Sequence, residues 1–173
     1  MACDRTPGQD TGDRRRSAAR WARRLAATAV IGAVTAACGG GGPASSVRQY
    51  EVLARSIPGL DEVITDGQGF TLYMYAPDHR GPSQCYGFCA QQWPPLVLPR
   101  GTTRPQAGPG VRAGLLGTVR RRNGELQETY GGWPLYLWIG DTSPGEATGQ
   151  ADDMGLWYAL SVTGAVDRGT PRS

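Results

Sequence analysis

The sequence predicts a small, mainly antiparallel β domain built from two pseudo-symmetric repeats, with one short helix near Cys85–Trp93. Three observations support this fold class. Residues 72–78 (LYMYAPD) return as residues 135–141 (LYLWIGD), and a duplication with so long a period marks one supersecondary unit used twice. Short alternating runs are separated by Asp-Gly and Asn-Gly pairs, which are typical of hairpins. The chain also holds 26 glycines and 13 prolines, which indicates many turns.

The first 37 residues have the organisation of an export signal. Residues 14–24 are rich in arginine, and residues 25–37 form an apolar run without charge. A positive n-region followed by an apolar h-region is typical of a signal peptide, and this apolar run is too short for a membrane-spanning helix. Residues 1–37 are therefore interpreted as a signal peptide.

The residues around Cys38 resemble a bacterial lipobox, because small residues precede this cysteine at the end of the apolar run. The resemblance implies that Cys38 becomes the mature N-terminus, carries lipid and anchors the protein on the extracytoplasmic face of the cell membrane. Acyl chains contribute about 0.8 kcal/mol per buried CH2, so several chains make a firm anchor. The alternative is an ordinary signal peptide that is cut nearby and leaves Cys38 as a free thiol.

The charge of the mature chain argues against a nucleic-acid partner. Seven of the 18 basic residues and three of the 15 acidic residues precede Cys38. The mature part therefore keeps 11 basic and 12 acidic residues, a net charge near −1. A basic footprint for nucleic acid is therefore missing from the mature part of the sequence.

Composition divides the mature chain into a tether, a domain and a tail. Residues 38–56 are predicted to be a lipid-anchored flexible linker, because they begin with glycine, proline and serine. Residues 57–166 are predicted to form the domain, with repeat one at about 61–98 and repeat two at about 115–163. Residues 167–173 are polar and are expected to be disordered.

In the first repeat, Glu62–Thr65 and Phe70–Tyr75 are expected to form a hairpin around an Asp-Gly turn. Cys85–Trp93 is expected to form the short helix, which the two following prolines end. Residues 99–114 are rich in glycine and proline and are expected to be the surface loop that joins the repeats.

In the second repeat, Leu116–Arg122 and Glu125–Tyr130 flank an Asn-Gly pair, which is the strongest short hairpin signal. A Gly-Gly turn then leads into an expected strand over Trp133–Trp138. Trp157–Val162 is the last expected strand.

Each repeat places two aromatic side chains on one face of a strand, and a tryptophan opens the apolar run that follows. One interpretation is that these rings pack in the interior or as cross-strand pairs. The other is an exposed platform that stacks a sugar, a quinone or a partner. The candidate binding surface consists of Tyr73, Tyr75, Asp78, Trp93, Tyr136, Trp138, Asp141 and Trp157.

The duplicated aspartates have two interpretations. A carboxylate at a strand end commonly accepts backbone N–H bonds and fixes a turn, and each repeat must make the same turn. Alternatively, Asp78 and Asp141 meet in one cleft as general acid and base or as metal ligands. A carbohydrate-active enzyme of this kind needs the two carboxyl groups about 5–9.5 Å apart.

Cys85 and Cys89 lie in the first repeat, and in an exported protein this pair predicts a disulfide. The alternative is a redox or metal-handling accessory protein that uses the pair with Met74 or Met154. The single histidine, His79, argues against an imidazole-based metal site and against a Ser-His-Asp catalytic triad. We predict no catalytic residue, no metal site and no cofactor.

These motifs together resemble the bacterial secreted-repeat lipoproteins of unknown function. The likeness rests on the Tyr-x-(Phe/Trp/Tyr)-x-x-Asp motifs at Tyr73–Asp78 and Tyr136–Asp141, on the Cys85–Cys89 segment before Trp93, and on Gly149-Gln150 before Trp157. It covers about residues 60–163. The resemblance implies an exported, lipid-anchored envelope protein without an established activity. We therefore expect a non-enzymatic module that binds an envelope protein or a small ligand.

Overall fold

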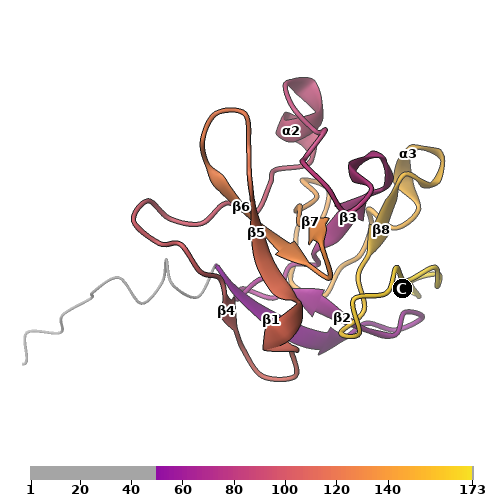
Figure 1. Cartoon of the computed structure of the whole chain (residues 1–173). Helices are drawn as coiled ribbons and strands as arrows, with labels where there is room; N and C mark the ends of the chain where they lie inside the picture. Colours follow the sequence, from indigo (N-terminus) through magenta and orange to yellow (C-terminus); the bar gives the residue numbers. More distant parts are fainter. Residues whose placement is uncertain (1–49, 173) are drawn as a thin grey trace, which may run out of the picture. The chain divides into compact units, whose positions relative to one another are not determined.

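A computed structural model describes residues 50–172 and shows a mainly β domain (Figure 1). The predicted signal peptide, the predicted lipid attachment at Cys38 and residues 38–49 of the predicted linker lie outside the described residues. Within the described part of the chain, no helix has the length and apolar character needed to cross a membrane.

The described residues form three small sheets and two short helices. The strands are β1 (Glu51–Ser56), β2 (Glu62–Thr65), β3 (Tyr73–Tyr75), β4 (Gln106–Ala107), β5 (Leu116–Arg120), β6 (Leu126–Tyr130), β7 (Trp133–Pro134) and β8 (Trp157–Ala159), and the helices are α2 (Phe88–Gln92) and α3 (Asp152–Gly155). The sheets have the orders β2-β1-β4, β3-β8 and β5-β6-β7. All pairs are antiparallel except the parallel pair of β1 and β4.

The hairpins β1–β2 and β5–β6 are equivalent parts of the duplication. Ser56 pairs with Glu62 in the first hairpin, and Arg120 pairs with Leu126 in the second. Each residue of the second pair lies 64 positions after its counterpart in the first. The repeating unit therefore begins with β1, one strand before the part of the duplication that the sequence motifs reveal.

The two repeats exchange strands. β3 of the first repeat pairs with β8 of the second, with Tyr73 opposite Ala159. In the equivalent pairing, Tyr136 of the second repeat lies opposite Pro95 of the first. Because Pro94 and Pro95 have no N–H group to donate, this second pairing is an isolated bridge rather than a regular ladder.

The exchanged strands are buried on both faces. Side chains of a strand alternate between its two faces, so Tyr73 enters one hydrophobic cluster while Leu72 and Met74 enter the other. The first cluster contains Ile57, Val63, Tyr73, Cys85, Trp93, Tyr136, Ala147, Trp157 and Ala159, and the second contains Val52, Ile64, Leu72, Met74, Leu96, Tyr130, Leu135 and Leu160.

The structure confirms the predicted antiparallel β fold with two repeats, although several elements are shorter than expected. The helix predicted over Cys85–Trp93 is reduced to α2, and the strand predicted over Trp133–Trp138 is reduced to β7. A second short helical segment, α3, in which Asp153 and Met154 adopt left-handed backbone conformations, occupies the equivalent position in the second repeat and was not predicted.

One prediction about the first half of the chain is wrong, and another is confirmed with one addition. The flexible linker was expected to extend to residue 56, but β1 begins at Glu51 because its backbone pairs with β2. The surface loop over residues 99–114 contains β4, which adds to the other edge of β1.

The predicted disorder of residues 167–173 is also wrong for residues 167–172. Asp167 is buried, and its Oδ2 accepts a hydrogen bond of 2.7 Å from the backbone N–H of Asp61. The backbone N–H of Arg172 donates to the carbonyl of Pro58 at 2.8 Å. This segment packs against the turn between β1 and β2 because these bonds hold it there.

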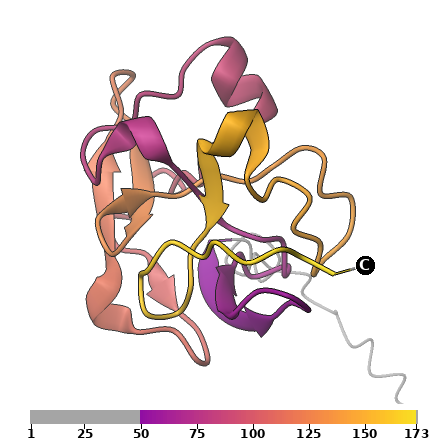
Figure 2. The ribbon, with the colours of Figure 1, turned by 90° about the vertical axis from the view of Figure 1, so that its right-hand side faces the viewer.

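The helices α2 and α3 lie at the same end of the domain in both views, away from β1 and β2 (Figures 1 and 2). Trp93 directly follows α2, and Trp157 follows α3 after one residue. The equivalent helices therefore lead into the two duplicated tryptophans.

Candidate functional site

Two buried tyrosines bind the aspartates of the opposite repeats. Tyr73 Oη donates to Asp141 Oδ2 at 2.7 Å, and Tyr136 Oη donates to Asp78 Oδ2 at 2.7 Å. Both tyrosines are fully buried, and the two aspartates are nearly so. Burial and the adjacent carboxylates raise the pKa of each phenol far above its ordinary value, so both stay protonated donors.

The remaining oxygen of each carboxylate closes a turn. Asp78 Oδ1 accepts the backbone N–H of Gln84 at 2.7 Å, and Asp141 Oδ1 accepts the backbone N–H and the hydroxyl of Thr148 at 2.8 and 2.6 Å. Burial raises the pKa of Asp78, and its hydrogen bonds act in the opposite direction. Every oxygen of the two carboxylates has a protein partner, which supports the turn-fixing interpretation over acid–base catalysis.

Four aromatic rings form a stacked column through the domain. The ring centroids of Tyr75 and Trp157 are 4.2 Å apart, those of Trp157 and Trp93 are 3.9 Å apart, and those of Trp93 and Trp138 are 4.3 Å apart. The two central tryptophans are parallel within 2°. Each stacked pair contributes about 0.5–1.5 kcal/mol beyond the apolar area that it buries.

The prediction that the candidate binding surface is exposed is wrong for six of its eight residues. Tyr73, Asp78, Trp93, Tyr136, Asp141 and Trp157 are buried, because strand exchange covers both faces of the strands that carry the motifs. Tyr75 and Trp138, the two ends of the column, are partly exposed.

A cavity of about 240 Å³ lies beside the Trp138 end of the column. Its lining combines apolar side chains with two carboxyl groups and one amide: Asp66, Gln68, Phe70, Pro94, Leu137, Trp138, Ile139 and Asp141. A larger cavity of about 560 Å³ lies elsewhere, between residues 145–150 and Pro171–Arg172, and its lining contains no aromatic side chain. The cavity at Trp138 therefore joins the duplicated motif to the surface.

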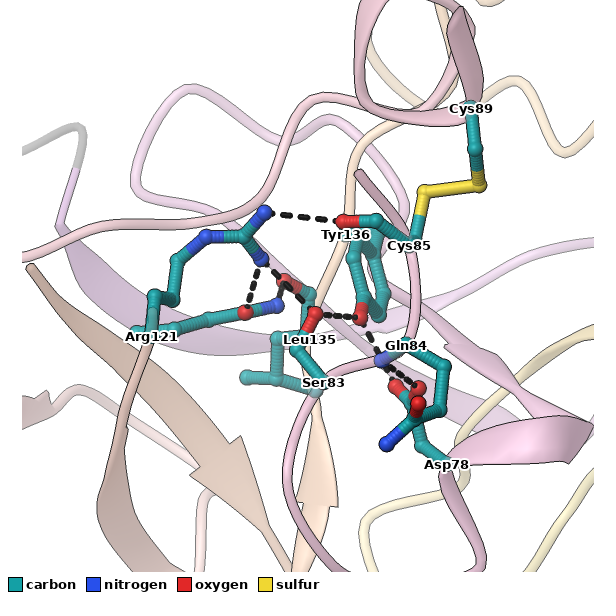
Figure 3. The surroundings of a disulfide bond; sticks show 9 residues. Asp78, Ser83, Gln84, Cys85, Cys89, Arg121, Leu135 and Tyr136 are labelled. Carbon is teal, nitrogen blue, oxygen red and sulfur yellow. Dashed lines mark hydrogen bonds between the residues drawn. A yellow bond between two sulfur atoms is a disulfide. The ribbon is translucent and has the colours of Figure 1, made fainter. Parts of the chain in front are cut away.

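The predicted disulfide between Cys85 and Cys89 is confirmed, and a buried arginine holds its turn (Figure 3). Arg121 donates to the carbonyl of Cys85 and to Ser83 Oγ, both at 2.8 Å, and also to the side chain of Gln127. Ser83 Oγ in turn bonds to Tyr136 Oη at 2.7 Å. A polar chain thus connects the disulfide turn to the crossed Tyr–Asp pairs.

Sequence reasoning missed three buried polar residues of the second repeat. Arg121, Gln127 and Glu128 are 5%, 0% and 0% exposed. Their counterparts 64 positions earlier, Ile57, Val63 and Ile64, are also buried but apolar. Aligning the β1–β2 hairpin with the β5–β6 hairpin would have revealed these positions, because each buried polar residue then lies opposite an apolar one.

Glu128 is the most unusual of the three. The backbone of Glu128 bonds to Leu96 and Leu135 in the same way that the backbone of Ile64 bonds to Leu160 and Leu72. Both carboxyl oxygens are buried without a hydrogen-bond partner, and burial raises the pKa of Glu128 to about 8. The second repeat therefore keeps an acid where the first repeat has an aliphatic core residue.

The described residues do not bring together the side chains proposed for metal handling. Within residues 50–172, no group of three or more His, Cys, Asp or Glu could hold a metal ion. Met74 is buried in the second hydrophobic cluster, whereas Cys85 belongs to the first. Met154 is 97% exposed on α3, and His79 is exposed at a turn.

Comparison with known proteins identifies the repeat. A family model described as "Secreted repeat of unknown function" matches residues 60–97 and 117–161. The two matched segments correspond to the two structural repeats. No curated protein and no solved structure matches the chain.

Proposed function

The chain belongs to this family of secreted repeats and is an extracytoplasmic protein, and on that premise we propose that it is a lipid-anchored, non-enzymatic binding protein. Its ligand site is the cavity at Trp138. The observation that carries this proposal is the contrast between the duplicated residues: the aspartates are held by internal hydrogen bonds, whereas the ring of Trp138 reaches the surface.

The stacked column favours Trp138 as a binding platform. Its ring rests on Trp93, which is 4% exposed and is itself stacked on Trp157. A ring held in this way loses little conformational freedom when a ligand binds, so the binding free energy is not spent on ordering the side chain. Small-molecule sites also combine mostly apolar walls with a few fixed polar groups, as this cavity does.

Internal hydrogen bonds occupy Asp141, one of the two acids that line this cavity, which favours a binding role for this residue over acid–base catalysis. A general acid or base must reach the proton that it transfers, and the carboxyl of Asp141 already accepts from Tyr73 and Thr148. The single histidine of the chain, His79, does not line this cavity.

The sequence supports anchoring at Cys38. Twelve residues, from Cys38 to Gln49, precede the first described residue, Tyr50. A fully extended chain spans about 3.3–3.6 Å per residue, so this tether reaches at most about 40 Å. A lipid on Cys38 therefore keeps the domain within a short distance of the membrane.

Detergent partitioning tests the anchor. Wild-type protein from cells should enter the detergent phase of a phase-separating non-ionic detergent, and protein produced without residues 1–38 should enter the aqueous phase. Intact mass should show acylation of the wild type. An unacylated wild type that stays in the aqueous phase would contradict the anchor.

Indole N–H resonances test the binding site. Low-molecular-mass extracts of the producing cell's envelope should shift the resonance of Trp138 and leave that of Trp133, which does not line the cavity, in place. Equal shifts of both resonances, or none at Trp138 for any extract, would show that this cavity is not the site.

A further inference from the structure

Three of the partly exposed aromatic rings outside the column, those of Tyr86, Trp133 and Tyr158, lie under an arginine, whereas Tyr50 and Phe70 do not. The guanidinium carbons of Arg122, Arg80 and Arg168 lie 4.5, 5.5 and 4.6 Å from the ring centres of Tyr86, Trp133 and Tyr158, respectively. A cation within about 6 Å of a ring centre is attracted by the negative face of the ring. The domain thus covers these three rings with its own cations.

Trp138 differs from these rings. Among residues 50–172, no arginine lies over its face, and no basic residue lines the adjacent cavity. Tryptophan has the most favourable ring for a cation. Trp138 therefore combines the best ring type with a face that the described chain leaves without a cation.

The charged groups that line this cavity are acids. Asp66 and Asp141 both contribute to the lining. Asp66 is 1% exposed, and its Oδ1 accepts the backbone N–H groups of Gln68 and Phe70, each at 2.9 Å. These bonds fix the carboxyl at the cavity wall without supplying a positive charge.

No basic side chain of the described residues offsets the buried charge of Asp66. Burial raises the pKa of this carboxyl, and the opposing influences are backbone hydrogen bonds from Phe70, Gln68 and Gly69. Arg55 lies near this turn, where its guanidinium packs against Gly69, but it does not line the cavity. A cation inside the cavity would provide the missing countercharge.

We propose that the cavity at Trp138 binds an organic cation, an ammonium or guanidinium group, against the ring of Trp138 and beside the carboxyl of Asp66. This inference rests on the proposed binding function and names its ligand class. The apolar walls, Phe70, Pro94 and Ile139, suit the alkyl substituents of such a cation. The cation comes either from a free small molecule or from a basic side chain of a partner protein.

A pair of isosteric probes tests the charge requirement. Choline and its neutral carbon analogue 3,3-dimethylbutan-1-ol have nearly the same shape, so a difference in affinity reports the charge. We expect choline to shift the indole resonance of Trp138 with a Kd at least tenfold lower than that of the alcohol. The full-length mature protein is used in a maltoside detergent, which contains no choline group.

Charge removal at one aspartate provides the matched variant. Asp66→Asn retains an oxygen acceptor for the turn and should raise the Kd for choline about tenfold while leaving that of the alcohol unchanged. Asp153→Asn, an exposed change on α3, should leave both unchanged. N-acetyl-arginine amide, which mimics an arginine side chain of a partner protein, is titrated in parallel. A lower Kd for this probe than for choline would indicate a partner's side chain, and a lower Kd for choline would indicate a free small molecule.

The possible results separate this inference from the proposed function. Equal binding of choline and the alcohol would overturn the cation while retaining a ligand site at Trp138. Failure of every probe to shift Trp138 would also overturn the cation, whereas a shift by envelope extract would still support the binding function. Because the comparison of probes needs no variant, misfolding of Asp66→Asn cannot obscure the outcome.

Discussion

Tyr73 and Tyr136 exchange both of their backbone hydrogen bonds, with distances of 2.9 and 3.0 Å between the amide nitrogen and the carbonyl oxygen. These two residues occupy the same position in the two repeats, so the exchange lies at the centre of the internal pseudo-symmetry. Their side chains then cross to the aspartates of the opposite repeats. One pair of equivalent residues thus links the repeats through both backbone and side chain.

Removal of either crossed hydroxyl should destabilise the domain. Tyr73→Phe and Tyr136→Phe each leave a buried carboxylate without one donor, at a cost of about 1–3 kcal/mol in the free energy of unfolding. Urea denaturation measures the change. Tyr158→Phe is the control, because it keeps a partly exposed ring; a loss for this control as large as for the crossed tyrosines would contradict the role of the hydrogen bonds.

Truncation of the column should be most costly at its centre. Trp157 is 1% exposed, so Trp157→Ala should lower the free energy of unfolding by about 3–5 kcal/mol. Trp138→Ala should cost less, about 1–2 kcal/mol, because that ring is already partly in water. Chemical denaturation followed by circular dichroism compares the two, and equal losses would be inconsistent with the different burial of the two rings.

The buried polar pair Arg121 and Gln127 should be replaceable as a unit by the apolar residues of the first repeat. Arg121→Ile alone leaves Gln127 and other buried acceptors without their donor, at about 1–3 kcal/mol per group. The double variant Arg121→Ile/Gln127→Val reproduces Ile57 and Val63 and should recover the part of that loss that comes from Gln127, whereas Ser83 and the carbonyl of Cys85 still lack their donor. Additive losses in a double-mutant cycle would show that the two side chains do not act together.

Glu128 should make the domain less stable as pH rises. An acid whose pKa is raised in the folded state binds its proton more tightly in that state than in the unfolded state. The contribution of this proton to the free energy of unfolding is therefore complete below the unfolded-state pKa and is lost as the pH rises through the folded-state pKa. For Glu128 the window runs from the ordinary glutamate pKa of 4.5 to a folded-state pKa of about 8. The upper bound on the loss is about 5 kcal/mol, at about 1.36 kcal/mol per pKa unit.

Urea midpoints at pH 6, 7, 8 and 9 measure this effect above the usual titration range of aspartates. Glu128→Gln keeps the size of the side chain without an ionisable proton, so its profile should be flat over this range. Glu128→Ile, which restores the residue type of Ile64, should also be flat and more stable at pH 9 than the wild type. Parallel profiles for wild type and Glu128→Gln would assign the pH dependence to another group.

The sequence predicts the parts of the fold that depend on local signals. Asn123-Gly124 predicts the β5–β6 hairpin, because that pair adopts the backbone conformations of a tight turn. Strand β1 escapes prediction because Glu51–Ser56 alternates poorly and one of its two pairing partners, β4, is distant in the sequence. Non-local pairing of this kind leaves no mark on a short window of sequence.

The sequence predicts which residues belong to the candidate site but not which of them are exposed to solvent. The repeated motifs identify Tyr73, Trp138 and their counterparts, yet period-2 alternation assigns side chains to faces without saying whether a face is covered. Strand exchange covers both faces, which buries Tyr73 and leaves Trp138 at the end of the column. Arg121 and Glu128 were missed because charged residues on a hairpin are usually solvated.

The crossed pairing also bears on how such a chain originates. One repeat alone would have a tyrosine without its acceptor, an aspartate without its donor and a tryptophan with one bare face, so its natural complement is a second copy of itself. The two-repeat chain therefore has the form of a homodimer fused into a single polypeptide, with residues 99–114 as the join. Identical subunits must carry every substitution twice. After fusion the two halves can differ, as Arg121 and Glu128 in one half differ from Ile57 and Ile64 in the other.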